Sequence, residues 1–236
     1  MSDTVIREVV KDVWTFSRPF ARFGIFPFGG RSTAIKLHNG GVWILASTPL
    51  NDETKSKLKD IGDVKYIIGA DAVHYLYLAD FKQEYPDAKL IGVAGALNNI
   101  KDKTLKFDGL WGRDPPDTKY GFEDEIQHCY FSGYQNRDVA FLHTPSKTLI
   151  EADLMLNLPA TEQYSKSLSW AFGNVKPNSW LHRNVVQSQA TDVEAMKRDS
   201  RKVAAWDFDR IIPCHGDVIE TDGNKAWRDA YKHFID

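Results

Sequence analysis

Two stretches of the sequence place polar side chains where an apolar strand is expected to end. In residues 141–157, two apolar runs flank a polar turn, and the second run ends on a carboxylate, Asp153. A carboxylate at the end of a core strand needs either backbone hydrogen-bond donors or a bound cation. Residues 211–216 form a short apolar run that breaks into Pro213-Cys-His-Gly216. Together these stretches predict two strands that carry a polar site at their ends.

The two stretches resemble the last part of the metallo-β-lactamase superfamily. In that family a Thr-Pro-Gly-His-Thr turn, a strand that ends in a metal-bridging Asp and a late Pro-Gly-His-Gly turn converge on a metal centre. Here Thr144-Pro-Ser-Lys-Thr148, Asp153 and His215 follow in the same order. Most of the chain is also similar to an uncharacterised branch of this superfamily in bacteria and fungi, which has no well-defined reaction. The resemblance implies the αββα sandwich fold and a metal-dependent hydrolase.

The resemblance also implies a reduced set of metal ligands. The first ligand motif of the family, His-x-His-x-Asp-His, falls on residues 69–75, where Ala70 and Ala72 replace the two histidines. His74 stands at the Asp of the motif, or at its last His after a shift of one residue. With Asp153 and His215 it makes two histidines and one carboxylate, a known mononuclear set for zinc or iron. We therefore expect one divalent metal, zinc rather than iron, or no metal at all.

Lys147 occupies the place of a metal-ligating histidine in the turn that the resemblance identifies. An ammonium about 4 Å from a divalent ion is repelled by several kcal/mol at an effective dielectric near 20, so both cannot share that place. Lys147 is then a positive group that polarises a substrate oxygen or pairs with Asp153, a neutral base of lowered pKa, or a solvated turn residue. We prefer the first interpretation, which makes Lys147 and Asp153 the catalytic residues.

Four further residues are candidates for the wall of a substrate pocket. His143 precedes Lys147 by four residues, although a single histidine in an apolar run is more often a hydrogen-bonded core residue. Phe26 belongs to a loop at residues 18–30 with four phenylalanines, which either completes the core or covers a pocket as a lid. His182 and Trp170 lie in an aromatic insertion, residues 158–189, that we expect to determine substrate specificity.

Composition limits the class of protein and of partner. A chain of 236 residues with 42% hydrophobic residues suits a single domain spanning residues 1–236. The formal net charge is -2 with mixed signs along the chain, so neither nucleic acid nor an anionic membrane is an expected partner. The polar N-terminus and the lack of a long apolar run predict a cytoplasmic protein that acts on a small molecule. Oligomeric state is not indicated.

Periodicity predicts the same order of elements twice, a meander followed by helix and strand. The expected strands are residues 12–16, 32–37, 42–47, 65–70, 89–94, 126–131, 138–143, 147–152 and 209–213. The expected helices are residues 51–61, 72–85, 191–206 and 224–234, the third with a capping box at Thr191 and Glu194. Residues 108–124 are expected to be loop. Two such halves predict an α/β fold of two mixed sheets packed face to face with helices outside.

Two classes of function follow from these patterns. In the first, a single metal activates water to attack a small ester, lactone, thioester or amide, and Lys147 steadies the oxyanion. In the second, the ligand losses mark a non-hydrolytic descendant, either a small-molecule-binding protein without metal or a mononuclear iron redox enzyme. Metal analysis of the purified protein separates the two classes.

Overall fold

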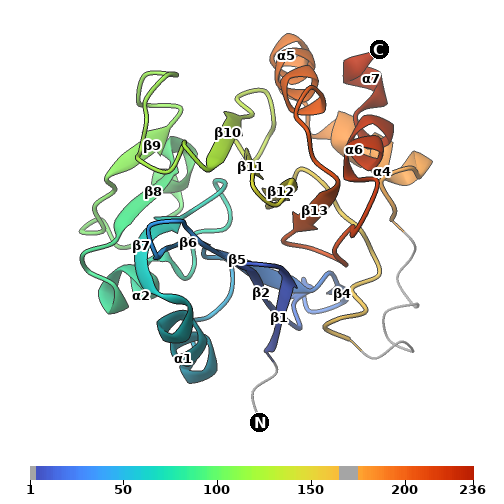
Figure 1. Ribbon diagram of the computed structural model, residues 1–236. Helices are drawn as coiled ribbons and strands as arrows, with labels where there is room; N and C mark the ends of the chain where they lie inside the picture. The colour runs from blue at the N-terminus through green and yellow to red at the C-terminus, as the bar shows by residue number, and fades with distance from the viewer. Residues whose placement is uncertain (1–3, 165–174) are drawn as a thin grey trace.

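Two β-sheets face each other, and helices cover their outer faces (Figure 1). The computed structural model describes residues 4–164 and 175–236. The larger sheet has the strand order β1-β2-β5-β6-β7-β8-β9, and the smaller has the order β10-β11-β12-β13. A short hairpin, β3-β4, forms a third sheet. This arrangement is the predicted αββα sandwich.

The strands of the larger sheet are β1 (Val5–Val10), β2 (Val13–Arg18), β5 (Gly30–Lys36), β6 (Gly41–Leu45), β7 (Asp63–Ile68), β8 (Lys89–Val93) and β9 (Gly109–Trp111). The smaller sheet consists of β10 (Ile126–Tyr130), β11 (Val139–His143), β12 (Thr148–Glu151) and β13 (Arg210–Pro213), and the hairpin of β3 (Ala21–Arg22) and β4 (Phe26–Pro27). The helices are α1 (Asp52–Ile61), α2 (Leu78–Glu84), the 3₁₀ helix η1 (Ala94–Asn98), α4 (Trp180–Ser188), α5 (Val193–Ala204), α6 (Gly223–Ala230) and α7 (Lys232–Ile235). None of the helices in the described ranges is long and apolar enough to cross a membrane.

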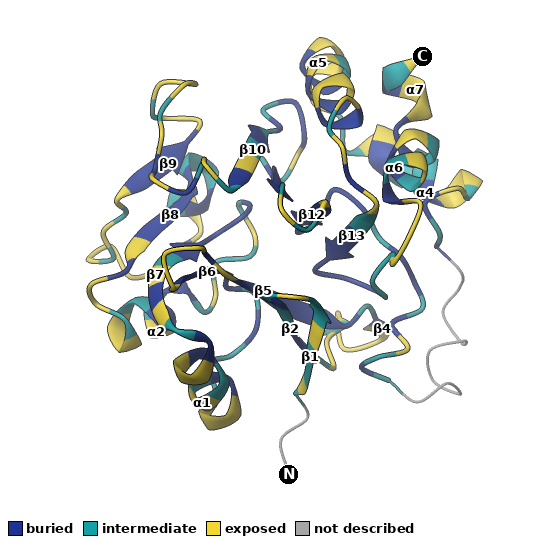
Figure 2. Ribbon diagram, in the orientation of Figure 1, coloured by how far each residue is buried: buried dark blue, intermediate teal, exposed yellow. Residues whose placement is uncertain are grey.

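Alternating side chains on the small sheet account for two of the apolar layers, one on each face of that sheet. Phe141 and Ile150 are paired across β11 and β12, and both face the large sheet. Their neighbours Leu142 and Leu149 are also paired and face the outer helices. Strands buried on both faces explain the near-continuous apolar runs in the sequence. Figure 2 shows buried residues along the strands and exposed residues on the outer surfaces of the helices.

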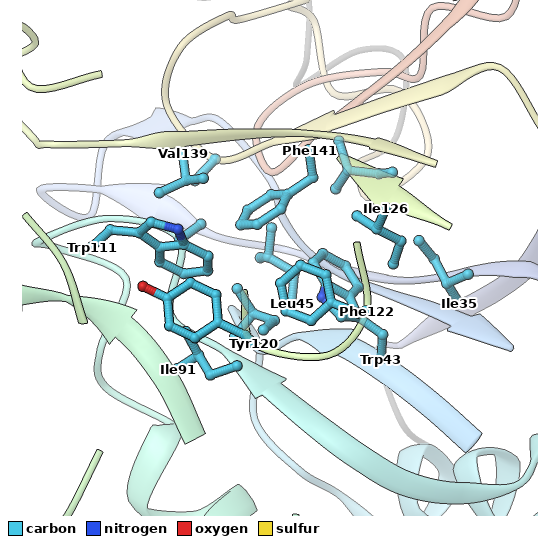
Figure 3. Packing of buried hydrophobic residues seen from close by; sticks show 14 of the residues in the cluster. Ile35, Trp43, Leu45, Ile91, Trp111, Tyr120, Phe122, Ile126, Val139 and Phe141 are labelled. Atoms are coloured by element: carbon cyan, nitrogen blue, oxygen red, sulfur yellow. The ribbon is translucent and has the colours of Figure 1, made fainter. Parts of the chain in front are cut away.

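Aromatic rings join the two sheets in the central layer (Figure 3). Phe141 of the small sheet contacts two tryptophans of the large sheet edge-on, with ring centroids 5.0 Å from Trp43 and 5.5 Å from Trp111. Edge-to-face pairs at this spacing add to the gain from apolar burial. The sheets are therefore held against each other by shape-matched rings as well as by aliphatic side chains.

One predicted helix is wrong over its first half. Residues 72–85 were expected to be helical, but α2 begins only at Leu78. The carboxylate of Asp71 accepts the backbone N–H groups of Val73 and His74, which holds this segment in a turn. As a result Leu76 lies outside the helix and is 66% exposed.

Several element boundaries also differ from the sequence prediction. The N-cap of α5 is Asp192, whose side chain accepts the N–H of Ala195, whereas Thr191 donates its hydroxyl to Gly133 O. The capping box predicted at Thr191 is therefore wrong. Strand β9 lies within the predicted loop 108–124, and the predicted last helix is divided into α6 and α7. Helix α1 agrees with the predicted range 51–61: Asn51 caps it by accepting the N–H of Thr54, and Gly62 follows its end.

Replacing Phe141 with alanine should lower the free energy of unfolding by about 3–5 kcal/mol, because a fully buried ring between two tryptophans leaves a cavity. Urea unfolding measures the loss. Phe23→Ala is the matched control, since Phe23 is 80% exposed and its removal should change stability by less than about 0.5 kcal/mol. Similar losses in the two variants would contradict the assignment of Phe141 to the central layer.

Candidate metal centre

The candidate site lies beyond the carboxyl ends of parallel strands. Strands β12 and β13 are parallel, with Glu151 paired to Pro213 at their ends. Asp153 and His215 each follow this pair by two residues, so the strand register brings them side by side. His74 follows β7, which is parallel to both of its neighbours in the large sheet. Ligands gather at such strand ends in many open α/β sheets.

The structure brings together the three side chains that the sequence singled out as metal ligands. Ligand atoms of His74, Asp153 and His215 all lie within 4.8 Å of one another. His215 Nε2 is 3.2 Å from His74 Nε2 and 3.3 Å from Asp153 Oδ1, and His74 Nε2 is 3.9 Å from the same oxygen. Tetrahedral ligands at about 2.0–2.1 Å from zinc are separated by about 3.3 Å, so the three atoms fit one metal ion.

Hydrogen bonds on the far side of each imidazole aim both Nε2 atoms at the centre of the site. His215 Nδ1 is 2.6 Å from the carbonyl oxygen of Gly29, which can only accept, so this nitrogen carries the proton. His74 Nδ1 is 2.8 Å from Asp71 Oδ2. Carboxylate and carbonyl partners of this kind orient metal-ligating histidines in proteins. In the neutral rings, two nitrogen lone pairs and one carboxylate oxygen thus converge without a donor between them.

The electrostatics of the site favour a positive charge. Burial alone would lower the pKa of His74, but the carboxylates of Asp71 and Asp153 outweigh it and raise the pKa to about 10. Burial would raise the pKa of Asp153, yet His74, His215 and Asn136 hold it well below its usual range. The three groups therefore stabilise a cation at their centre.

A second layer of residues around Asp153 was not found from the sequence. Asn136 Nδ2 donates to Asp153 Oδ2 at 2.7 Å, and the hydroxyl of Tyr134 donates to the carbonyl oxygen of Asp153 at 2.8 Å. The backbone N–H of Asp153 donates to Asp138 Oδ2 at 2.6 Å. These residues precede β11, whose start lies at the same sheet edge as the end of antiparallel β12. The antiparallel order of β11 and β12 is therefore the signal in the sequence that could have indicated residues 134–138 as neighbours of Asp153.

The predicted role of Lys147 beside Asp153 is wrong. Lys147 lies in the turn between β11 and β12, and Asp153 follows the other end of β12. At about 3.3 Å per residue, the strand keeps the two side chains far apart. Lys147 Nζ instead pairs with Asp207 at 2.7 Å, and its side chain is 58% exposed. The hydrogen bond to Asp207 raises the pKa of Lys147, which also contradicts a neutral base.

The other pocket candidates lie away from the three ligands or outside the described residues. His143 bonds through Nδ1 to Ser146 Oγ in the same distant turn, at 2.7 Å. His182 is buried on α4, where its Nε2 accepts the N–H of Leu156 at 2.9 Å. Phe26 is half-exposed on β4, and Trp170 falls outside the described residues. None of the three described candidates lines the cavity at the site.

A cavity of about 360 Å³ opens onto the three ligands. Its wall includes Phe20, from the segment between β2 and β3, whose ring stacks on His215 with centroids 5.6 Å apart. Phe28 contacts the same imidazole edge-on at 6.0 Å. Two residues of the aromatic loop, Phe20 and Phe28, therefore contact His215, whereas Phe26 does not line the cavity.

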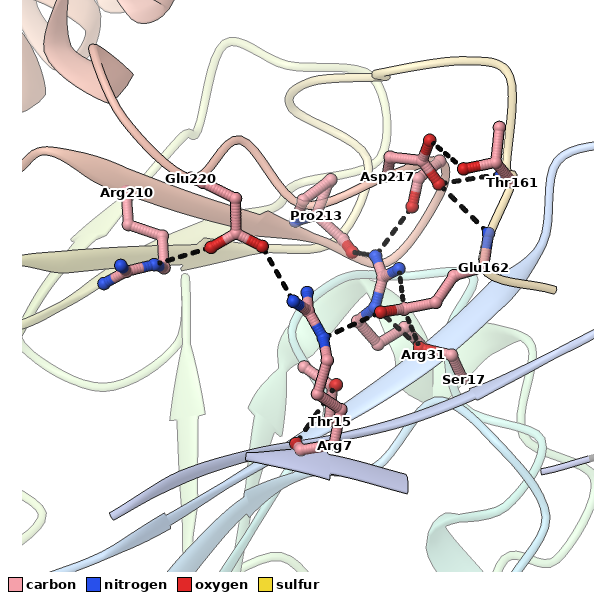
Figure 4. A network of polar contacts seen from close by, with 11 residues as sticks. Arg7, Thr15, Ser17, Arg31, Thr161, Glu162, Arg210, Pro213, Asp217 and Glu220 are labelled. Atoms are coloured by element: carbon pink, nitrogen blue, oxygen red, sulfur yellow. Dashed lines mark hydrogen bonds and ion pairs between the residues drawn. The ribbon is translucent and has the colours of Figure 1, made fainter. Parts of the chain in front are cut away.

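A buried arginine fixes the loop that carries His215 (Figure 4). Arg31 on β5 donates from Nη1 to the carbonyl oxygens of Pro213 and Gly216, at 2.6 and 2.8 Å. Its Nη2 pairs with Glu162 at 2.9 Å. The backbone N–H of Gly216 donates to Phe28 O, next to the Gly29 carbonyl that receives His215. The large sheet thus holds both ends of the His215 turn.

Comparison with known proteins identifies the fold. No protein-family model matches the chain, and no curated protein matches its sequence. Among solved structures, the DIM-1 metallo-β-lactamase exposed to ceftazidime has a TM-score of 0.62 at 12% identity, over 98% of each chain. A metallo-β-lactamase from Hirschia baltica has a TM-score of 0.62 at 9% identity, over 98% of this chain and 97% of that one.

A third similar structure is the metallo-β-lactamase FIM-1 from Pseudomonas aeruginosa in its mono-zinc form. Its TM-score is 0.59 at 12% identity, over 99% of this chain and 97% of that chain. The chain therefore has the metallo-β-lactamase fold over almost its whole length.

Asp71→Asn should weaken metal binding about 10- to 100-fold, because an amide nitrogen in place of Oδ2 cannot accept the Nδ1–H of His74. Competition against a chromophoric chelator measures the affinity. Asp80→Asn, an exposed acid in the first turn of α2, is the matched control and should keep the affinity of the wild type. Equal affinities of the two variants would rule out orientation of His74 by Asp71.

The stability of the protein should fall in mild acid in part through His182. Burial, aided by the charge of Arg183, lowers the pKa of His182 to about 4, against about 6.5 in the unfolded chain. Between these values the unfolded chain binds more protons, so the free energy of unfolding decreases as pH falls from about 6.5 to about 4.

His182→Gln keeps an acceptor for Leu156 without titrating and should show a shallower decline between pH 7 and pH 4.5 in urea unfolding. His233→Gln removes an exposed histidine and serves as the control. If both variants decline as steeply as the wild type, His182 does not contribute.

Proposed function

We propose that the protein is a metal-dependent hydrolase of a small ester, lactone, thioester or amide. It uses one divalent metal, zinc rather than iron, held by His74, Asp153 and His215. The observation that carries this proposal is the convergence of two Nε2 atoms and one carboxylate oxygen whose partners leave no donor between the neutral rings. The fold shared with metallo-β-lactamases, one of them in a mono-zinc form, supports it.

Within residues 4–164 and 175–236, no further ligand accompanies His74, Asp153 and His215, which favours one metal over two. Ala70 and Ala72 carry no ligand atoms, and Lys147 lies at the far turn. Tyr134 uses its hydroxyl on the carbonyl oxygen of Asp153. Among the described residues, the three-residue set is the group of histidines, cysteines and acids that could hold an ion.

The chemistry divides between the metal and residues of the chain. A divalent metal lowers the pKa of bound water towards 7 and so supplies a nucleophile at neutral pH. Asp71 and the carbonyl of Gly29 keep the imidazoles in their productive tautomers. Asn136 fixes Asp153 through an amide N–H and also lines the cavity, so in this proposal it takes the oxyanion role that was expected of Lys147.

Metal content and hydrolysis should be measured on the same preparations. The wild type is expected to hold about one equivalent of metal by mass spectrometry, and to hydrolyse members of a panel of nitrophenyl esters, thioesters, lactones and amides. His215→Ala and Asp153→Ala should each lower both metal affinity and hydrolysis more than about 100-fold. His233→Ala, an exposed histidine on α7, is the matched control.

Three results would overturn parts of this proposal. No metal after incubation with excess zinc or iron would leave a small-molecule-binding protein. Iron with redox activity and no hydrolysis would point to a mononuclear iron enzyme. Hydrolysis that survives both ligand substitutions would place the chemistry elsewhere in the chain.

A further inference from the structure

The β3-β4 hairpin is apolar and carries a single charged residue. Residues 19–30 contain four phenylalanines and one isoleucine, and Arg22 is the charged residue of this range. Three large apolar side chains around the turn are exposed to solvent: Phe23 is 80% exposed, Ile25 60% and Phe26 42%. A group of exposed apolar side chains on a protein surface marks a site of contact with a partner or with a lipid surface.

The exposed apolar surface continues to the cavity that opens onto the three ligands. Arg22, which is paired with Phe26 in the hairpin, lines this cavity. Phe20, just before β3, also lines it and is 44% exposed. From the segment after β7, Val73 and Leu76 line the same cavity and are 44% and 66% exposed. A surface that covered the hairpin would therefore lie next to the mouth of the cavity.

The backbone of the hairpin satisfies its hydrogen bonds internally. Four N–H groups of the segment donate to carbonyl oxygens of the same segment at 3.0–3.2 Å: Gly24 to Ala21, Ile25 to Arg22, Phe28 to Phe26 and Gly29 to Phe20. An unpaired backbone group is costly in lipid, where no water is present to bond it. A protein partner makes no such demand, because it supplies donors and acceptors of its own. The internal bonding therefore favours a lipid surface as the partner.

Arg22 suits the boundary between lipid headgroups and acyl chains. Its guanidinium lies 5.4 Å from the centre of the Phe23 ring, within the hairpin. An arginine can bury its aliphatic stem in an apolar layer while its charged end stays at the level of the headgroups. Residues 19–30 hold no acidic side chain, which lipid phosphates would repel. Apolar side chains beside a basic residue are also the composition of segments that bind at membrane interfaces.

We propose that the β3-β4 hairpin binds the surface of a phospholipid bilayer. Phe23, Ile25 and Phe26 contact the acyl chains, and Arg22 lies among the headgroups. The net charge of -2 does not indicate this partner, because it describes the whole chain and not one apolar hairpin. The cavity then opens at the bilayer, and its substrate is an ester or thioester with a long acyl chain. That substrate class rests on the function proposed above, whereas lipid binding does not.

Sedimentation of the full chain with phospholipid vesicles tests the proposal. Vesicles of phosphatidylcholine, and of an equal mixture of phosphatidylcholine and phosphatidylglycerol, should bind the wild type before and after removal of metal by EDTA. Phe23→Ala should weaken binding to both at least about tenfold, because the exposed ring loses its contact with acyl chains. Arg22→Gln should weaken binding to the mixed vesicles by up to about fivefold, and to phosphatidylcholine alone by less.

A control variant and a second measurement locate the contact. Trp180→Ala removes an aromatic side chain that is 73% exposed on α4, and it should bind vesicles like the wild type. Cys129 and Cys214 are buried, so an environment-sensitive dye coupled to the Phe23→Cys variant reports on position 23. Its fluorescence should rise when vesicles are added. The same dye on Trp180→Cys should not respond.

Two results would overturn the proposal outright. One is that the wild type does not sediment with either kind of vesicle, and the other is that Phe23→Ala and Trp180→Ala bind equally well. Self-association of the wild type that Phe23→Ala abolishes, without any binding to vesicles, would assign the apolar surface to a second copy of the chain instead of to lipid.

Hydrolysis separates this inference from the function on which its substrate class rests. The zinc-loaded wild type should hydrolyse a long-chain nitrophenyl ester carried in vesicles, and Phe23→Ala should lower that rate more than the rate with nitrophenyl acetate. Vesicle binding without hydrolysis of either ester would contradict the hydrolase and leave the lipid contact standing.

Discussion

The parallel pairing of β12 with β13 is the constraint on which the candidate site depends. Because Glu151 is paired with Pro213, the chain leaves both strands at the same level, and the N–H of Cys214 still donates to Glu151 O. Asp153 and His215 then emerge as neighbours. A slip of one residue would turn every side chain of the strand to the opposite face and would send Leu149 and Ile150 into the wrong apolar layers. The packing of the core on both faces of the small sheet thus also sets the separation of two ligands.

The large sheet contributes to the same site through a buried charge. Arg31 is fully buried, and such a group is tolerated only when it is paired and its donors are satisfied. It meets this demand with two carbonyl oxygens of the His215 turn, the hydroxyl of Ser17 and the carboxylate of Glu162. The requirement for satisfied donors therefore ties β5 to the turn after β13. Arg31 and the Gly29 carbonyl hold His215 from one side, while the strand register holds it from the other.

How far the sequence predicts this structure depends on whether the signal is local. Apolar runs and the resemblance to metallo-β-lactamases were enough for the sandwich, for most core strands, and for the convergence of His74, Asp153 and His215. The predicted position of Lys147 is wrong because the resemblance rests on the residue types of the turn, Thr144 and Pro145, whereas strand β12 separates this turn from Asp153. Apolar spacing predicts a helix at residues 72–77, but hydrogen bonds from the backbone to the side chain of Asp71 hold the start of this segment in a turn. Partners that meet only through tertiary contacts, such as Asn136 and Arg31, leave no periodic pattern in the chain.

The expectation that Asp153 needs a cationic partner was sound, but the structure meets that need with other residues. His74 lies between Asp71 and Asp153, and Asn136 occupies the second oxygen of Asp153. Asp138 and Glu151 lie in the same buried region, and burial raises the pKa of each carboxyl well above its usual range, which favours their neutral forms. The region therefore limits its negative charge in two ways, by pairing Asp71 and Asp153 with histidine and by disfavouring ionisation of the other two acids. A lysine beside Asp153 would add a positive charge where histidine is already paired with the carboxylate. Its ammonium would also repel a divalent ion bound there. The balance of charge thus explains why Lys147 can lie in a solvent-exposed turn, paired with Asp207, without cost to the site.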